Sequence, residues 1–155
     1  MARTLQAELK ATKPFSSLEQ EAMLSLARTA AQLDHDMLEA LKPHGLTPTQ
    51  YNALRILRGA GSAGLCRNEV RDRLVAWVPD ATRLLDRLED TGLVVRGREG
   101  DDRRFVRARI TRQGLDLLTR LDPVITDLHQ RQLGHLGRNK LKALIELLED
   151  ARDRA

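Results

Sequence analysis

The chain has 155 residues, 41% hydrophobic and 31% charged, which is enough to bury one core and excludes a disordered composition. Only four residues are aromatic, so stacking platforms for nucleotide bases are not expected, while a net charge of +4 is compatible with a nucleic-acid partner. One cysteine excludes an intramolecular disulfide and no apolar run is long enough for a membrane helix, so we expect a cytoplasmic protein with no membrane partner.

The first predicted element is a long amphipathic helix over residues 17–41. Its apolar residues recur in steps of three and four, for example at Met23, Leu26 and Ala30. Pro43 is expected to end the helix shortly afterwards. A helix of about six or seven turns cannot bury its apolar stripe inside so small a domain, so we expect a second copy of the chain to cover it.

The next predicted helix has a clear start signal between Thr47 and Gln50. Threonine at the N-cap, proline at the first helical position and glutamine at the third form a capping box. The helix continues through Leu54, and Gly59 is predicted to cap its end. Residues 64–65 are predicted to form a very short strand.

Two short helices then follow each other closely. The first is predicted from Arg67 to Val75, and the second opens at Pro79 and ends at Gly92, which acts as a glycine C-cap. About three or four residues, including Trp77, are expected to join them, and so tight a connection is typical of a helix-turn-helix.

The apolar period then changes from helical to alternating. Residues 93–95 and 104–110 are predicted as strands, the second because apolar and polar side chains alternate along it. The polar, glycine-containing segment 99–103 between them predicts a β-hairpin. After Thr111 the helical period returns in two further helices, separated near Gly134. The predicted fold is therefore mainly α with a small β-hairpin.

Positive charge gathers on this hairpin. Between positions 94 and 112 the excess of arginines over acidic residues is four, which equals the net charge of the whole chain. These arginines are Arg96, Arg98, Arg103, Arg104, Arg107, Arg109 and Arg112. A hairpin directly after a helix-turn-helix is a wing, and arginines there favour contact with phosphates. The alternative is that the cluster is only the solvated surface of a hairpin.

Three stretches of the sequence resemble the MarR family of winged-helix regulators, and the resemblance covers nearly the whole chain. The most specific is 102–111, where an Asp-x-Arg turn ending at Arg104 leads into an alternating strand that finishes in Ile-Thr, with Gly114 shortly after. Residues 82–94 resemble the recognition helix of the family running into the first wing strand. Residues 45–50 resemble the start of the preceding helix.

The resemblance implies a homodimeric transcription regulator that is not an enzyme and needs no cofactor. Residues 1–155 would form a single domain, with a winged helix-turn-helix over 46–117 and dimerisation helices over 1–45 and 118–155. Two recognition helices would then lie about one DNA turn apart, near 34 Å, and would fit a near-palindromic site in double-stranded DNA. Most members of the family are repressors, so the resemblance implies that this chain also represses transcription.

The recognition helix is expected in the major groove and the wing in the minor groove. Residues at the start of such a helix contact base edges, and an arginine suits a narrow, electronegative minor groove. By the resemblance, Arg104 is the wing-tip arginine and Asp102 braces it. The expected DNA contacts are Arg67, Asp80, Ala81, Thr82, Arg83, Arg87, Arg98, Asp102, Arg103 and Arg104. Because acids repel phosphates, Asp80 would either accept from a cytosine amino group or cap its own helix.

A small aromatic or anionic effector is the expected ligand, bound between the dimerisation helices and the winged domain. The candidate pocket residues, chosen by their location alone, are His35, His44, Tyr51 and Trp77. The effector would favour a spacing of the recognition helices that no longer fits DNA. Such coupling requires different affinities of the effector for the two states.

Two alternative functions stay open. One is a non-specific architectural DNA-binding protein, and the other is a regulator that responds to redox state through Cys66, which stands where many relatives have a capping serine or threonine. Residues 59–64 match the GxGxxG pattern, but a capped helix precedes them, whereas dinucleotide binding requires a strand there. The four histidines lack the spacing of metal ligands, so no metal is expected.

Overall fold

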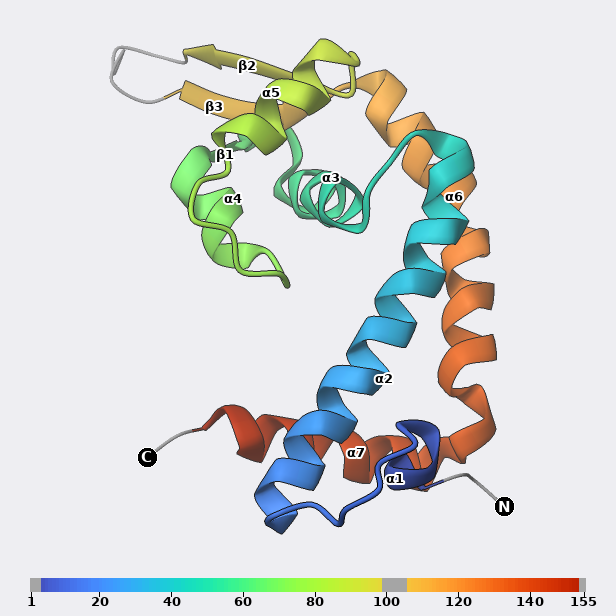
Figure 1. Cartoon of the computed structure of the whole chain (residues 1–155). Coiled ribbons are helices and arrows are strands. Elements are labelled where there is room, and N and C mark those ends of the chain that lie inside the picture. The colour runs from blue at the N-terminus through green and yellow to red at the C-terminus, as the bar shows by residue number, and fades with distance from the viewer. Residues whose placement is uncertain (1–3, 99–105, 154–155) are drawn as a thin grey trace.

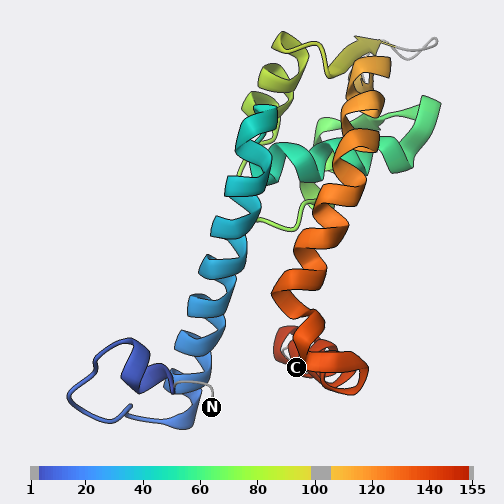
Figure 2. The same ribbon diagram turned by 90° about the vertical axis from the view of Figure 1, so that its right-hand side faces the viewer.

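The computed structural model describes residues 4–98 and 106–153. This part of the chain is mainly helical with one three-stranded antiparallel sheet, which confirms the predicted fold class. Two long helices, α2 (Leu18–Leu41) and α6 (Arg112–Leu133), run between a winged lobe at one end of the molecule and helix α7 (Gly137–Arg152) at the other (Figure 1). The view in Figure 2 shows the same separation of the two ends.

The long helices begin and pack as their sequences suggest. Ser17 caps α2, because its side chain accepts a hydrogen bond from the Gln20 N–H at 3.1 Å. Further along, Gln132 of α6 donates from its side-chain amide to the Leu33 carbonyl of α2 at 3.2 Å. The short helix α1 (Leu5–Glu8) lies beside the first turns of α2, at the α7 end of the molecule (Figure 1).

The hydrophobic core lies where α3 (Pro48–Ala60) packs against α2, α6 and the sheet. The predicted capping box is confirmed: Gln50 N–H donates to Thr47 Oγ1 at 3.2 Å, and Thr47 N–H donates to Gln50 Oε1 at 2.9 Å. The prediction that Gly59 caps this helix is wrong, because the helix continues and Gly61, with φ of 61°, ends it. The largest fully buried side chains are Leu41, Leu54, Leu57, Val70, Leu85, Leu88, Val94, Leu118 and Leu121.

The helix-turn-helix differs from the prediction in its connection. Helix α4 (Arg67–Arg73) ends two residues early, and α5 (Thr82–Asp90) begins three residues after Pro79, where the start was predicted. The chain leaves α4 because its backbone becomes extended and the Val75 N–H donates to the side-chain oxygen of Asn52 at 2.9 Å. The connection is therefore about twice as long as the three or four residues of a minimal helix-turn-helix.

The predicted hairpin is confirmed, and the very short strand predicted at residues 64–65 is present one position later, at Leu65–Cys66. Strands β1 (Leu65–Cys66), β2 (Val94–Arg98) and β3 (Val106–Ile110) form an antiparallel sheet in the order β1-β3-β2. Ala108 is the fully buried centre of β3, paired with Leu65 on one side and with β2 on the other. Strand β2 continues to Arg98, which is three residues beyond the predicted end of this strand at residue 95.

Two glycines allow the backbone to approach the sheet closely. Gly64 has φ of 64°, and a Cβ atom there would lie 2.6 Å from the Ala108 carbonyl oxygen. Gly114, in the first turn of α6, would place a Cβ atom 2.5 Å from the Leu93 carbonyl oxygen. Only glycine therefore fits at the points where β1 and α6 join the wing.

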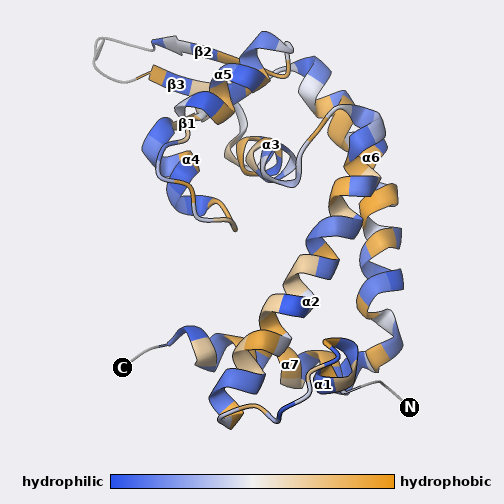
Figure 3. Ribbon diagram, in the orientation of Figure 1, coloured by the Kyte–Doolittle hydropathy of each residue, from blue (hydrophilic) through white to orange (hydrophobic). Residues whose placement is uncertain are grey.

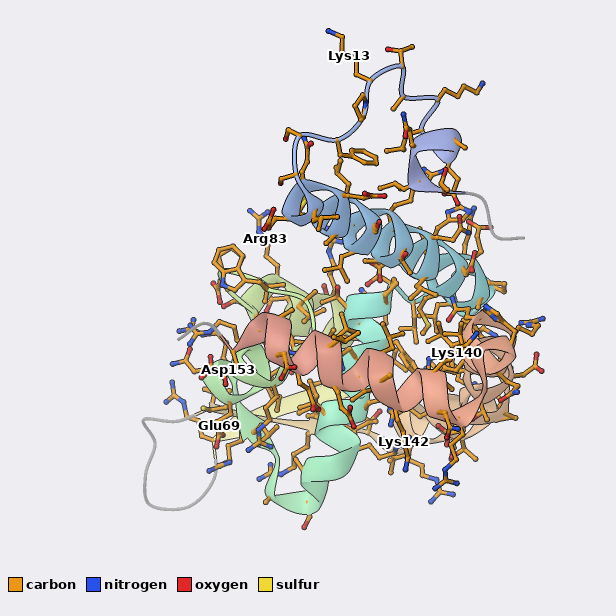
Figure 4. All side chains as sticks on the ribbon, turned by 90° about the horizontal axis from the view of Figure 1, so that it is seen from below. Lys13, Glu69, Arg83, Lys140, Lys142 and Asp153 are labelled. Carbon is orange, nitrogen blue, oxygen red and sulfur yellow. The ribbon has the colours of Figure 1, made fainter. Side chains whose placement is uncertain are left out.

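The terminal helices leave apolar surface exposed. Helix α7 buries none of its side chains, and α2 buries only Leu41. Hydropathy colouring shows hydrophobic residues continuing along α2 and α7, outside the winged lobe (Figure 3). Seen from the α7 end, this helix lies across the molecule and carries Lys140 and Lys142 (Figure 4). Exposed apolar residues of these two helices are Leu18, Met23, Leu26, Leu38, Ile145 and Leu147.

Candidate nucleic-acid interface

Helix α5 has one buried apolar side and one exposed basic side. Leu85 and Leu88 are buried in the core of the winged lobe, while Arg83 and Arg87 are exposed. Because they are four residues apart, the two arginines lie on the same face of the helix. Figure 1 shows α5 beside the β2–β3 hairpin, at the end of the molecule away from α7. The basic face and the wing therefore belong to one end of the protein.

The start of α5 is held by side chains that the sequence assigned to DNA contact. Asp80 Oδ1 accepts from the Thr82 N–H at 3.0 Å and from Thr82 Oγ1 at 2.7 Å. These hydrogen bonds from Thr82 lower the pKa of Asp80. Arg67, in the first turn of α4, donates to Thr82 Oγ1 at 3.2 Å and lies 3.7 Å from Asp80 Oδ1. Asp80 thus accepts from the first N–H of its own helix, from the position before the N-cap residue Ala81.

Ala81 does not belong with these surface residues. Its exposed fraction is 0%, so it faces the core, and the sequence-based expectation that it contacts DNA is wrong. Its apolar side chain was the available signal for burial. Three expected contacts, Asp102, Arg103 and Arg104, lie outside the described residues. Arg98, at the end of β2, is exposed.

Most of the wing arginines within the described residues contact the protein itself. Arg107 donates to the Gly64 carbonyl at 3.1 Å, and Arg109 donates to the Ser62 carbonyl at 2.6 Å. Arg112 pairs with an acid on its own helix at 3.1 Å. These three arginines belong to the positive cluster seen in the sequence but were not among the expected DNA contacts, and their contacts show that charge density along the sequence does not say where each side chain points.

Arg96 has the most extensive internal contacts of these arginines. Its guanidinium donates to Glu89 Oε2 at 2.9 Å and 2.7 Å, and it lies 2.6 Å from Asp86 Oδ1. Its backbone N–H also donates to Glu89 Oε1 at 2.9 Å. The hydrogen bonds from Arg96 lower the pKa of Glu89, and those to Glu89 raise the pKa of Arg96. Strand β2 is thus attached to α5 through two carboxylates.

Cys66 stands at the N-cap of α4. Its backbone N–H donates to Glu69 Oε2 at 2.8 Å, and this hydrogen bond is the main cause of the lowered pKa of Glu69. The thiol is half-buried. The position is therefore that of a helix cap, as the comparison with capping serine or threonine in the sequence suggested.

A cavity of about 370 Å³ lies between the winged lobe and the long helices. Of the four pocket residues expected from the sequence, only Tyr51 lines it. Trp77 is 88% exposed, and His44 is exposed in the turn after α2. His35 points away, because the cavity side of α2 carries residues 33, 34 and 37, and a helix turns by about 100° per residue. The lining residues are Leu33, Asp34, Met37, Pro48, Thr49, Tyr51, Asn52, Arg55, Val75, Ala76, His129, Gln132 and Leu133.

An ion pair next to this cavity connects the winged lobe to the long helix α6. Arg58 of α3 donates two hydrogen bonds to the Asp122 carboxylate, at 2.9 Å and 3.1 Å. The hydrogen bonds from Arg58 lower the pKa of Asp122. Arg55, one helical turn before Arg58, lines the cavity. Sequence reasoning missed this pair, because its partners are 64 positions apart.

Within residues 4–98 and 106–153, no helix is both long enough and apolar enough to cross a membrane. The same residues contain no group of three or more histidine, cysteine, aspartate or glutamate side chains arranged to hold a metal ion.

Comparison with known proteins agrees with this geometry. Residues 44–104 match the model of the MarR family. A MarR transcription factor from Planctomyces limnophilus is 43% identical in sequence, and its crystal structure aligns over 88% of this chain and 98% of that chain with a TM-score of 0.67. The transcriptional regulator YkoM of Bacillus subtilis is 28% identical over 142 residues, which are 88% of this chain and 90% of the relative.

A third similar protein was solved on DNA. The transcriptional repressor CouR, bound to a 23-mer DNA duplex, is 28% identical, and the alignment covers 97% of this chain and 99% of that chain with a TM-score of 0.75. The fold and the basic end of the molecule therefore define a winged helix-turn-helix transcription regulator. The chain belongs to the MarR family, whose members are transcription regulators and not enzymes.

Proposed function

We propose that this protein is a sequence-specific repressor that binds a near-palindromic operator as a homodimer and releases it when a small aromatic or anionic effector binds. The observation that carries the proposal is the exposed basic face of α5 directly beside the wing, on a MarR-family fold. The similar repressor CouR, solved on a DNA duplex, supports the same use of this end of the molecule.

In this proposal α5 lies in the major groove and the wing in the minor groove. Thr82 and Arg83 are near the start of α5, where residues of a recognition helix contact base edges, and Arg87 extends the same basic face. The flanking phosphates would be contacted by Arg67 of α4 and by Arg98 and Arg103 of the wing. Arg104 would enter the minor groove, and Asp102 would brace it.

Selection of genomic fragments by the purified protein tests DNA recognition. The best fragment is then titrated by fluorescence anisotropy against a scrambled duplex of the same length, with Arg104→Ala alongside. We expect a preference of about a thousandfold or more for the selected fragment, and a weaker preference in the variant. Equal, weak binding to all fragments, unchanged by Arg104→Ala, would overturn the proposal and favour an architectural DNA-binding protein.

The homodimer is supported by the apolar surface of the terminal helices. Met23 and Leu26 of α2 are 56% and 46% exposed, and Ile145 and Leu147 of α7 are 54% and 66% exposed. Residues of this kind are normally covered, and continuous apolar patches mark interaction surfaces. We therefore propose that segments 1–45 and 118–155 pair with those of a second copy.

Light scattering combined with size-exclusion chromatography tests this pairing. The expected mass is that of two chains of 17.5 kDa each. Leu26→Glu combined with Ile145→Glu should give monomers that bind operator DNA weakly, because only one recognition helix remains in each particle. The matched control is Val95→Glu, which places a charge on an exposed apolar residue of β2 and should leave the mass unchanged. A monomeric wild-type protein would contradict the dimer.

The effector site is proposed in the cavity between the winged lobe and the long helices. Met37, Tyr51 and Leu133 provide apolar wall, and Arg55 provides a cation for an anionic ligand. Benzoate is a simple probe with an aromatic ring and a carboxylate. The emission of Trp77, the single tryptophan, should report its binding, because the neighbouring residues 75 and 76 line the cavity.

Benzoate is expected to change Trp77 emission and to release the operator, both less strongly in Arg55→Met than in the wild-type protein. Absence of both effects over a series of aromatic carboxylates would contradict the effector class. The redox alternative has its own test: treatment with hydrogen peroxide should leave operator binding equal in the wild-type protein and Cys66→Ser. A loss of binding that Cys66→Ser prevents would favour redox control instead.

A further inference from the structure

We propose that Arg96 is a positioning residue that sets the angle between helix α5 and the wing, so that both elements reach DNA together. The inference rests on the proposed DNA-binding function. Arg96 belongs to the positive cluster of the wing but was not among the DNA contacts expected from the sequence. The structure gives this side chain two partners on α5, Asp86 and Glu89, and these three residues are called the clamp below.

The contacts of Arg96 hold both its backbone and its side chain against α5. Glu89 accepts from the backbone N–H of Arg96 through Oε1 and from its guanidinium through Oε2. Asp86 Oδ1 lies 2.6 Å from Nη2 of Arg96, which is also the nitrogen that donates to Glu89 Oε2. Ordinary exposed ion pairs contribute little to stability. A carboxylate that bridges the backbone and the side chain of one strand residue, however, fixes the position of that strand along the helix.

Burial keeps Arg96 from acting as a phosphate contact. Its side chain is 26% exposed, compared with 46% for Asp86 and 36% for Glu89. Reaching a phosphate would require it to leave both carboxylates. Because a helix advances about 100° per residue, Asp86 lies about 100° and Glu89 about 160° around α5 from the exposed Arg87. The clamp therefore occupies the wing side of α5 and leaves the basic face open.

The position of the clamp matters for the wing. Arg96 is in the middle of β2, paired with Ala108 of β3, so it acts on both strands of the hairpin. A strand advances about 3.3 Å per residue, so a change in the direction of β2 at Arg96 displaces Arg98 and the residues after it by a distance that increases along the chain. Loss of the clamp is thus expected to misplace the wing relative to α5, and contacts made by the two elements would no longer form at the same time.

A double-mutant cycle tests the coupling between the clamp and the wing. Arg96→Met, Arg104→Ala and the double variant are titrated on the selected operator and on scrambled DNA. We expect Arg96→Met to weaken operator binding at least tenfold and scrambled binding less than twofold, and Arg104→Ala to cost much less in the Arg96→Met background. Equal losses on both duplexes, with a salt slope reduced by about 0.9 for each lost phosphate contact, would show that Arg96 binds phosphate directly.

Glu89→Gln gives a second test in which the two explanations differ in sign. This variant is more positive by one charge, so simple electrostatics predicts tighter binding to every duplex. The positioning role predicts instead that the preference for operator over scrambled DNA falls at least fivefold. An unchanged preference in Glu89→Gln would overturn the proposal. If Arg96→Met does not fold, Glu89→Gln tests the proposal on its own.

Arg112→Met is the matched control. Arg112 is exposed at the start of α6, outside the proposed dimerisation segments and the proposed DNA contacts. It pairs with Asp116 of the same helix at 3.1 Å, so its replacement removes one charge without touching the clamp. The operator preference should stay at the wild-type value, and thermal melting of each variant checks its fold. If the wild-type protein itself shows no preference, the proposed function fails and this inference fails with it. If the wild-type protein shows the preference and Glu89→Gln retains it in full, the inference alone is overturned.

Discussion

Replacing Gly114 by alanine should destabilise the protein, although alanine is the better helix former. A Cβ atom at Gly114 would lie 2.5 Å from the Leu93 carbonyl oxygen and 2.6 Å from Ile110 Cγ1. The Leu93 carbonyl cannot retreat without cost, because it accepts a hydrogen bond from the Thr111 N–H at 3.0 Å. Overpacking of this kind costs about 1–3 kcal/mol, and the gain in helix propensity returns about 0.5–1 kcal/mol.

From the middle of each range, the expected net loss for Gly114→Ala is about 1 kcal/mol. In a chain of this size it should lower Tm by about 2–4 °C. The matched control is Gly59→Ala, because Gly59 lies within α3 and a methyl group added there would have no neighbouring atom within 4 Å. This control should stabilise the protein slightly.

Circular dichroism at one fixed protein concentration measures both variants, since the Tm of a dimer depends on concentration. The comparison isolates the close contact at Gly114, because both variants make the same chemical change in a helix. If Gly114→Ala melted at or above the temperature of Gly59→Ala, the reasoning about backbone contact would be refuted.

Three other substitutions test the core, a helix start and an ion pair. Leu54→Ala should lower the free energy of unfolding in urea by about 2–5 kcal/mol, because Leu54 is fully buried. Thr47→Ala should lower it by about 1 kcal/mol in the same assay, because the capping box is lost. Arg58 lowers the pKa of Asp122 below 3.8, so the stability that the ionised carboxylate contributes is present above pH 3.8 and lost as the pH falls through the lowered pKa. The difference in unfolding free energy between the wild-type protein and Asp122→Asn should therefore shrink below pH 3.8, and a constant difference from about pH 7 to about pH 2 would contradict this account.

Local chemistry made several elements predictable from the sequence. The capping box at Thr47 needs only residues within one turn, and so does the C-terminal turn at Gly92, where the Leu93 N–H donates to the Leu88 carbonyl at 2.9 Å. The hairpin was predictable because alternation along a strand reflects its two faces. In each case the determining groups are neighbours in the sequence.

Contacts between residues that are far apart in the sequence explain why the start of α5 and the lining of the cavity were predicted wrongly. Pro79 favours a helix start, but the Asp80 side chain accepts from the N–H of Thr82, where α5 begins, and Asn52 holds the chain 23 positions away at Val75. A cavity lies between the long helices and the winged lobe, where the effector was expected. Of the expected pocket residues only Tyr51 lines it, because a helix face cannot be assigned before the packing is known.

The acids on and near α5 show why net charge alone does not define a DNA-binding surface. A helix that carries Asp86 and Glu89 looks unsuited to phosphates, but the structure directs both carboxylates to Arg96 and leaves Arg87 on the exposed face. Removing Arg96 would therefore do more than delete one cation, because it would also break the side-chain contacts that attach strand β2 to both carboxylates of α5. For this reason a single substitution at Arg96 should change operator preference more than the loss of an exposed arginine such as Arg112, which pairs with an acid on its own helix.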